Sequence, residues 1–461
     1  MSSVLLKNCK SLVTMNEKRE SLSHVDILVK DEVISEIGKN LCNNNEGETG
    51  GCVPDSVVDC SNLVVMPGMI NTHHHFYQTL TRNLPACQNV ELFDWLLYLY
   101  DIWARMSPDD LKSGSQIAAA ELLATGCTTS VDHAYVYPND QNNYFDAEVE
   151  ALRETGIRMY LCRGSMSLSR EDGGLPPKSV VQTDEAIMAS CEDLVKRYHS
   201  SDPLSMLSVV LAPCSPFSVT AQLMKETAEY AKKHSLLIHT HLAETGDEND
   251  FCIEKVGMRP AEYLRSLGWM SDNAFFAHCV WLNEQEIKMM AETGAGVAHC
   301  PTSNMRLGSG IAPIMDMLKA GVKVSIAVDG SASNDSSDMI AEARQTMLLQ
   351  RVKNGAAAMT GLEALEVATL GGADVLNRKN SLGSIEVGKA ADIIGVNLNT
   401  LPYAGGLEDP GLAPIFCATN GVDLNMVNGD VLIEKGKFTK LDIERIIANH
   451  NEKAHKLVNN L

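Results

Sequence analysis

Residues 63–75 read LVVMPGMINTHHH, an apolar, β-rich run that ends in three consecutive histidines. A short apolar run of this kind is typical of a buried β-strand. Alternate side chains of an extended segment share a face, so His73 and His75 can reach one point while His74 points elsewhere. The stretch therefore predicts a buried strand at 63–72 with a pair of imidazoles at its carboxyl end.

The same pattern recurs along the chain, with a segment long enough for a helix after each β-rich run. The further runs are TTSVDH (128–133), IRMYLCRGS (157–165), LSVVLAPCS (207–215), SLLIHTHLAE (235–244), NAFFAHCV (273–280), GAGVAHCPTS (294–303) and VKVSIAVDGS (322–331). Strand and helix alternating eight times predict an α/β fold, a parallel (β/α)8 barrel of the TIM type. A doubly wound open sheet is the alternative, but the even spacing favours closure.

Turn-rich β sequence lies at both ends of the chain, outside the eight units. The first residues alternate apolar and polar side chains, and similar sequence returns near the end, where Asn428-Gly429 predicts a hairpin turn. The final residues, 441–461, predict a helix, and the polar stretch 43–51 predicts a surface loop. We expect one small β-sandwich domain formed by residues 1–65 and 379–461, beside a barrel at 66–378.

Composition and charge narrow the class of protein. The chain has 461 residues, 45% of them hydrophobic, and a formal net charge of −21. A surface that negative repels phosphate backbones, so we expect no nucleic-acid partner. No run approaches about 18 apolar residues, so we expect no membrane span. The start of the chain lacks a signal-peptide core, and the 13 cysteines show no paired framework, so we expect a cytoplasmic protein. We also expect a homo-oligomer of two or more chains.

Side chains that can hold a metal ion stand at the ends of four predicted strands. They are His73 and His75 on the first, His239 and His241 with Glu244 just beyond on the fifth, His278 on the sixth and Asp329 on the eighth. Enzymes built on this barrel work at the carboxyl ends of the strands. Three neutral imidazoles and one carboxylate suit a catalytic zinc that keeps a position for water. A lone strand histidine is more often structural, and His133 and His299 have no assigned role.

Several motifs together resemble the amidohydrolase superfamily, in its branch of mononuclear aromatic deaminases and triazine hydrolases. The resemblance covers nearly the whole chain and rests on residues 67–75, 240–244, His278, 301–305, 328–331 and the segment LGSIEVGKAAD at 382–392. Two further stretches, residues 73–82 and 163–168, resemble the members of that branch that act on 8-oxoguanine. The superfamily resemblance implies a metal-dependent hydrolase.

The resemblance also implies residue roles. His73, His75, His241 and Asp329 would bind one divalent ion, zinc first and iron as the alternative. Glu244 would protonate a ring nitrogen and then the departing amine, His278 would orient the attacking water, and Asp329 would take its proton. Binuclear branches usually place a Lys or Glu at the end of the fourth strand. Here that strand ends in Ala-Pro-Cys, so one ion is predicted, with Cys214 as a less favoured extra ligand.

We predict hydrolytic deamination of a small aromatic heterocycle, foremost 8-oxoguanine to urate and ammonia. The alternatives are deamination of isoxanthopterin or guanine, removal of an amino or chloro group from a hydroxytriazine, and a scaffold that has lost its chemistry. Four residues are predicted to contact the substrate: Gln78 as hydrogen-bond donor and acceptor, Arg163 as a cation, and Trp103 and Tyr135 as stacking rings. Core packing of the two rings and a structural ion pair for Arg163 are the competing interpretations.

Overall fold

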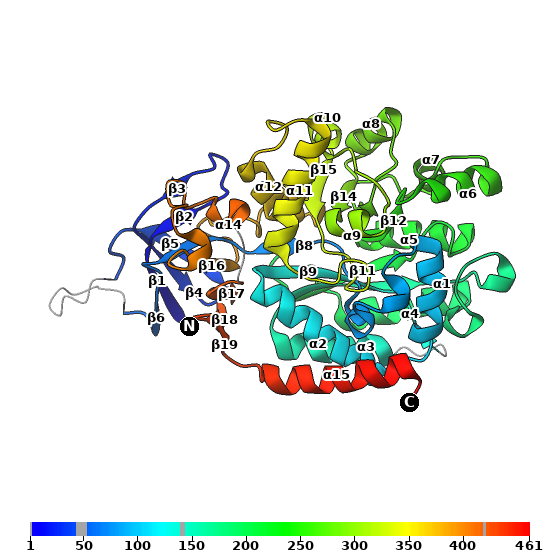
Figure 1. Ribbon diagram of the computed structural model, residues 1–461, viewed down its shortest axis with the longest axis horizontal. Helices are drawn as coiled ribbons and strands as arrows, with labels where there is room; N and C mark the ends of the chain where they lie inside the picture. Colours follow the sequence, from blue (N-terminus) through cyan, green and yellow to red (C-terminus); the bar gives the residue numbers. More distant parts are fainter. Residues whose placement is uncertain (1, 43–52, 139–142, 418–420) are drawn as a thin grey trace.

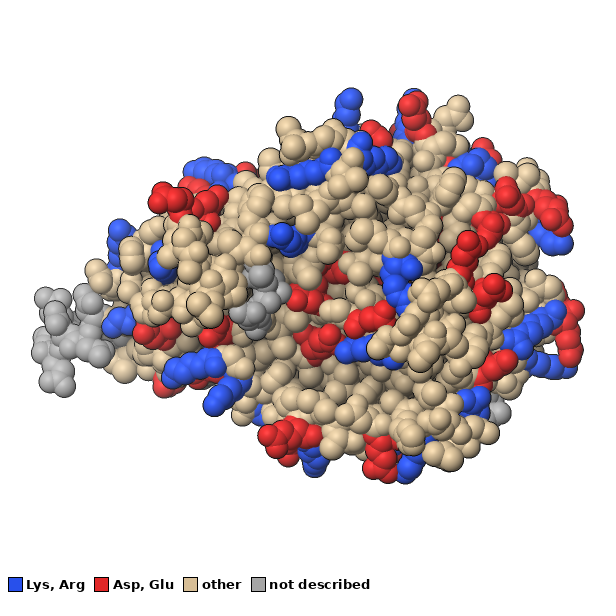
Figure 2. Space-filling view, in the orientation of Figure 1, with Lys and Arg blue, Asp and Glu red and all other residues tan. Residues whose placement is uncertain are grey.

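A parallel barrel stands beside a smaller β-rich region built from both ends of the chain (Figure 1). The computed structural model describes residues 2–42, 53–138, 143–417 and 421–461. The polar loop predicted at 43–51 lies outside these ranges. None of the helices in the described ranges is long and apolar enough to cross a membrane. Acidic and basic side chains are interspersed over the face drawn in Figure 2.

Eight parallel strands, hydrogen-bonded in chain order, form the barrel. They are β8 (Met69–Asn71), β9 (Cys127–Ala134), β10 (Arg158–Ser165), β11 (Leu207–Pro213), β12 (Ile238–Leu242), β13 (Ala274–His278), β14 (Gly296–His299) and β15 (Lys323–Ile326). The ring closes between β15 and β8, where the Thr72 amide donates to the Ile326 carbonyl at 3.4 Å and the Thr72 and Ser325 hydroxyls lie 2.6 Å apart. The predicted TIM-type barrel is confirmed.

The prediction of one strand at 63–72 was wrong, because the run is divided between two sheets. β7 (Leu63–Pro67) pairs with β16 of the small region, whereas β8 pairs with β9 of the barrel. Gly68 separates them, and a Cβ at this position would overlap the Thr128 side chain. Both halves are buried, so an apolar run gives no sign of the change of sheet.

Helices follow the barrel strands and cover its outer side (Figure 1). They are α1 (Leu92–Trp103), α2 (Pro108–Ala124), α3 (Asn143–Thr155), α4 (Asp184–Tyr198), α5 (Ala221–His234), α6 (Gly246–Val256), α7 (Pro260–Ser266), α8 (Glu284–Thr293), α9 (Pro301–Arg306), α10 (Ile314–Ala320), α11 (Met339–Asn354), α12 (Gly361–Ala368) and α13 (Leu370–Val375). Several begin at capping boxes, for example Ser107 with Asp110 at the start of α2. The main hydrophobic core lies between this helical layer and the barrel strands.

The two ends of the chain build the smaller sheets. One contains β5 (Val33–Gly38), β4 (Val25–Lys30), β1 (Ser3–Cys9) and β6 (Ser56–Asp59); the other contains β19 (Lys437–Phe438), β18 (Asp430–Glu434), β17 (Leu424–Val427), β16 (Ile393–Asn397), β7, β2 (Ser11–Val13) and β3 (Ser21–Leu22). The predicted turn is present, because Asn428 and Gly429 have φ of 52° and 83° between β17 and β18. The short α14 (Ala413–Phe416) precedes β17, and α15 (Ile443–Asn459) closes the chain along α2 (Figure 1).

Candidate active site

The four predicted metal ligands meet at the carboxyl ends of the barrel strands. Asp329 Oδ1 lies 3.3 Å from the Nε2 atoms of both His73 and His75. The Nε2 atom of His75 lies 3.3 Å from that of His241. Ligand atoms arranged tetrahedrally around one zinc at about 2.0–2.1 Å stand about 3.3–3.4 Å apart. The spacing of His73, His75 and Asp329 therefore fits one tetrahedral ion, and His241 approaches this group beside His75.

Hydrogen bonds determine, in two of these rings, which nitrogen carries the proton and which keeps a lone pair. His75 Nδ1 donates to the His133 carbonyl at 2.7 Å, and His241 Nδ1 donates to the Cys214 carbonyl at 2.5 Å. A carbonyl can only accept, so both rings carry the proton on Nδ1 and keep a lone pair on Nε2. Histidine ligands are commonly oriented in this way by an acceptor behind the ring.

His73 is oriented by a second histidine. His239 Nδ1 donates to the Phe275 carbonyl at 2.8 Å, so its Nε2 is an acceptor and takes the Nδ1 proton of His73 at 2.7 Å. His73 Nε2 then has a bare lone pair, and among the described residues this buried atom has no hydrogen-bond partner. Burial lowers the pKa of His73, His75 and His241, so all three are neutral, as metal ligands must be. The donor set fits a divalent metal ion.

Asp329 is held by donors on both oxygens. Oδ2 accepts from the hydroxyls of Ser303 at 2.6 Å and Ser333 at 2.9 Å, and Oδ1 accepts from the Gly330 amide at 2.7 Å. The backbone of Asp329 has φ of 62°, an unfavourable value for a residue with a side chain. Such strain is typical of functional sites, and here it directs the carboxylate at the imidazoles.

Glu244 and His278 face each other beside this cluster. Glu244 Oε2 lies 3.6 Å from His278 Nε2, which is also 3.9 Å from Asp329 Oδ2. Burial raises the pKa of Glu244 to about 7, so this carboxyl can hold or release a proton near neutrality. Burial works against a charged His278, but the carboxylates of Glu244 and Asp329 outweigh it and raise its pKa.

Two residues hold this pair in place. Glu248 accepts the amides of Ala243 at 2.9 Å and Glu244 at 2.8 Å, so it fixes the loop after β12. Asn304 Oδ1 accepts from His278 Nδ1 at 2.9 Å, which turns Nε2 toward the two carboxylates. Asn304 therefore orients His278 and does not itself line the cavity described below.

A cavity opens onto these side chains. Its polar wall contains His75, His241, Glu244, His278 and Asp329. The remaining wall is largely apolar or aromatic, and it comprises Leu92, Trp95, Leu96, Tyr100, Tyr135, Cys214, Phe217 and Leu307, with Gln78, Ser215, Glu248 and Ser333. In the part of the chain that the structure describes, no lysine or arginine lines this cavity. It suits an uncharged planar molecule.

Of the four predicted substrate contacts, Gln78 and Tyr135 lie on the cavity wall and Arg163 and Trp103 do not. Arg163 is buried, donates to Ser190 Oγ and Gln182 Oε1, and lies 4.2 Å from the centre of the Tyr137 ring. These contacts hold Arg163 in a structural role. The competing interpretation expected an ion pair, whereas the acceptors are a hydroxyl and an amide oxygen.

Trp103 is fully buried and donates its ring N–H to Thr81. It packs edge-on against Tyr77 and Trp95, and Trp95 stands between it and the cavity as a wall residue. Core packing, the competing interpretation, is the one that the structure supports for Trp103. The sequence could not separate Trp95 from Trp103, because both lie in the same apolar helix.

Sequence reasoning also missed supporting residues. Ser333 and Glu248 lie a few residues after Asp329 and Glu244, and Ser303 lies within the recognised stretch 301–305, so proximity was a usable signal. His239 was named at the end of the fifth strand, but its role as the acceptor that orients His73 was not predicted. The aromatic wall contributed by α1 left no comparable signal, since its residues read as an ordinary apolar helix.

The remaining predictions near the site have clear outcomes. His74 points away as expected, with Nε2 3.0 Å from Ser337 Oγ. Cys214 lines the cavity, and its carbonyl rather than its thiol contacts a ligand, His241. His133 and His299 are fully buried.

A TIM-type barrel with an imidazole and carboxylate cluster, a buried acid and a cavity that opens onto them defines a metal-dependent hydrolase. The model of the amidohydrolase family matches residues 64–432, and this chain belongs to that family. Among curated relatives, 8-oxoguanine deaminase of Pseudomonas aeruginosa is 45% identical over 403 residues, which cover 87% of this chain and 89% of the relative. Hydroxydechloroatrazine ethylaminohydrolase of Pseudomonas sp. is 34% identical, covering 96% and 93%.

Solved structures agree with this assignment. The zinc complex of the atrazine chlorohydrolase TrzN from Arthrobacter aurescens superposes with a TM-score of 0.92 at 29% identity, covering 98% of this chain and all of that one. The chain is thus a hydrolase of the deaminase and aminohydrolase type, acting on carbon–nitrogen bonds of cyclic amidines.

Proposed function

We propose that this chain deaminates an oxidised purine, converting 8-oxoguanine to urate and ammonia. The observation that carries the proposal is the Glu244–His278 pair beside Asp329, at the wall of a cavity that contains no lysine or arginine among the described residues. A relative named for this reaction is 45% identical over most of both chains, which supports the choice of ring. The wall suits a flat neutral base better than a phosphorylated one.

His73, His75, His241 and Asp329 would hold the metal ion, which we propose to be zinc. Three neutral imidazoles and one carboxylate are a usual ligand set of catalytic zinc, and the related TrzN structure contains zinc. When bound, the ion supplies Lewis-acid activation of water at neutral pH.

Proton transfers are divided between two carboxyl groups. Glu244 gives its proton to the ring nitrogen next to the amino-bearing carbon, which makes that carbon electrophilic. Asp329 takes a proton from the attacking water as its oxygen bonds to the carbon. Glu244 then takes the hydroxyl proton of the tetrahedral carbon and passes it to the amine, which leaves as NH₃, and the proton on Asp329 returns to Glu244. The ring keeps a carbonyl and an N–H, so atoms and protons balance.

His278 stabilises the oxygen on the tetrahedral carbon. Its Nδ1 is engaged by Asn304, so Nε2–H is the group free to donate to that oxygen. Preorganised donors of this kind act strongly in a site from which water is excluded. His278 therefore binds the developing charge, while Glu244 and Asp329 move protons.

The substrate ring would contact Gln78 and Tyr135. The Gln78 amide offers a donor and an acceptor to the polar edge of a purine, and the Tyr135 ring offers a face. Trp103 would act one layer behind the wall, through Trp95.

Removal of an alkylamine from a hydroxytriazine is the second candidate, because the 34% identical relative carries that activity in its name and covers 96% of this chain. Release of ammonia from 8-oxoguanine, guanine and isoxanthopterin, and of alkylamine from an alkylamino-hydroxytriazine, measured with the zinc-loaded chain, separates the candidates. We expect the highest kcat/KM for 8-oxoguanine. A clear preference for any other ring would replace our first choice, and absence of ammonia with all of them would remove deamination. Cytoplasmic location and homo-oligomeric assembly stay predictions.

A further inference from the structure

His133 is a buried histidine that the proposed chemistry does not use. Its Nε2 lies 2.8 Å from the Ala212 carbonyl, which can only accept, so Nε2 carries the ring proton. Burial holds the pKa of His133 well below its usual range, so the ring is neutral and Nδ1 keeps a lone pair. Within the described residues this Nδ1 has no hydrogen-bond partner. A buried acceptor without a partner costs free energy, which a bound donor or metal ion would recover.

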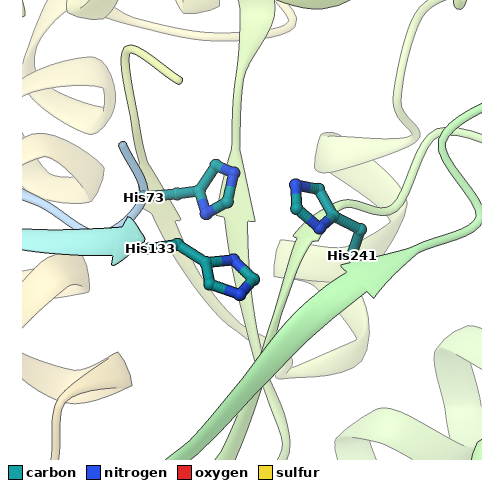
Figure 3. Close-up of side chains that lie close together, drawn as sticks. All are labelled: His73, His133 and His241. Atoms are coloured by element: carbon teal, nitrogen blue, oxygen red, sulfur yellow. The ribbon is translucent and has the colours of Figure 1, made fainter. Parts of the chain in front are cut away.

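The free nitrogen belongs to a group of three histidines. His73, His133 and His241 each offer a ring nitrogen within 4.8 Å of the other two. Their rings come from three different strand ends and face a common space (Figure 3). For His73 and His241 the available atom is Nε2, since the Nδ1 atoms are bound to His239 and to the Cys214 carbonyl.

We propose that these three histidines form a second metal position at the barrel mouth, made only of imidazole nitrogens and taking Cu²⁺. It rests on the proposed metal centre, because it shares His73 and His241 with it. Each of those Nε2 atoms has one lone pair, so one ion at a time can use them. The two positions are therefore mutually exclusive, and His133 belongs to one while His75 and Asp329 belong to the other.

The two positions differ in the ions they favour. The position with Asp329 is preformed, with neighbouring ligand atoms 3.3 Å apart, and it includes a carboxylate, which suits Mn²⁺ as well as zinc. The all-nitrogen position has three ring nitrogens within 4.8 Å of one another and no carboxylate, so it favours an ion with a high affinity for nitrogen. Cu²⁺ heads the usual affinity order for such sites. An ion held there lacks the Asp329 carboxylate, so Cu²⁺ inhibits the enzyme.

His133→Gln removes the Nδ1 lone pair, while its amide can still donate to the Ala212 carbonyl. The matched control is His299→Gln, since His299 is equally buried, stands at the end of β14 and is outside the group of three. The measurement is the Kd of the metal-free full chain for Cu²⁺ and for Mn²⁺, by calorimetry, with circular dichroism to verify folding.

We expect His133→Gln to weaken Cu²⁺ binding at least tenfold and to leave Mn²⁺ binding unchanged, with both unchanged in His299→Gln. Unchanged Cu²⁺ binding in His133→Gln overturns the proposal. If His133→Gln does not fold, Asp329→Asn gives the answer: we expect a large loss of Mn²⁺ binding with Cu²⁺ affinity kept within a few-fold, and an equal loss of both overturns the second position. A native chain that binds neither ion would instead contradict the proposed metal centre.

Discussion

Replacing Glu244 by glutamine isolates the proton-transfer step. Glutamine has nearly the same shape, and the backbone amide of residue 244 would still reach Glu248 at 2.8 Å, so the wall should stay in place. The change is in the proton: burial raises the pKa of Glu244 to about 7, so the native group exchanges a proton near neutrality, and an amide does not. Such transfer contributes about 10²–10⁴-fold, or about 3–5 kcal/mol of barrier.

The assay is ammonia release from 8-oxoguanine by Glu244→Gln, with zinc content measured on the same sample. We expect kcat to fall about 10²–10⁴-fold while zinc stays at the native level. Glu342→Gln is the matched control, because Glu342 is also buried, has its pKa raised by burial to about 7, and is not on the cavity wall. The kcat of Glu342→Gln should stay within a few-fold of the native value. Turnover of Glu244→Gln within a few-fold of native would refute the assigned role.

Three further changes test other parts of the account. Gly330→Ala places a Cβ where the Gln78 amide lies. Because one hydrogen bond to the substrate would be lost, KM should rise up to about tenfold at unchanged zinc content. An unchanged KM would show that Gln78 does not bind the substrate. Burial raises the folded-state pKa of Glu342 to about 7, so folding favours the protonated form of this carboxyl. The unfolding free energy of the native chain minus that of Glu342→Gln should therefore be highest below about pH 4.5 and about 3 kcal/mol lower at pH 8. Denaturant titrations that give the same difference at both pH values would contradict this. In the native chain Arg158 Nη2 lies 3.0 Å from Asp392 Oδ1, and Arg158→Met leaves that carboxylate buried without its partner. Denaturant titrations should show an unfolding free energy lower by about 3–5 kcal/mol. A loss under about 1 kcal/mol would show that the pair is dispensable.

The barrel and its ligand set were within reach of the sequence, because both depend on local patterns. Alternation of strand and helix gives the fold, and position at a strand end brings His75, His241 and Asp329 together whatever the loops do. The change of sheet at Gly68 was out of reach, since a strand buried in either sheet has the same apolar composition.

The wall of the cavity was predicted less well. Tyr135 immediately follows β9, so its side chain reaches the mouth by position alone, and Gln78 lies in the short 3-10 helix Phe76–Thr81 just after the His73–His75 pair. Trp103 and Arg163 were misjudged because their orientation depends on packing between helices and on hydrogen bonds to distant residues such as Gln182. Residue type indicates what a side chain can bind, but only its contacts decide which way it faces.

One titration tests the central claim most directly, that a single ion in this cluster serves deamination. Metal-free chain is titrated with zinc while ammonia release from 8-oxoguanine is recorded. Activity should be absent without zinc, rise in proportion to bound zinc, and level off at one ion per chain. Full activity of the metal-free chain, a plateau that requires two ions, or one bound zinc without ammonia release would contradict the account.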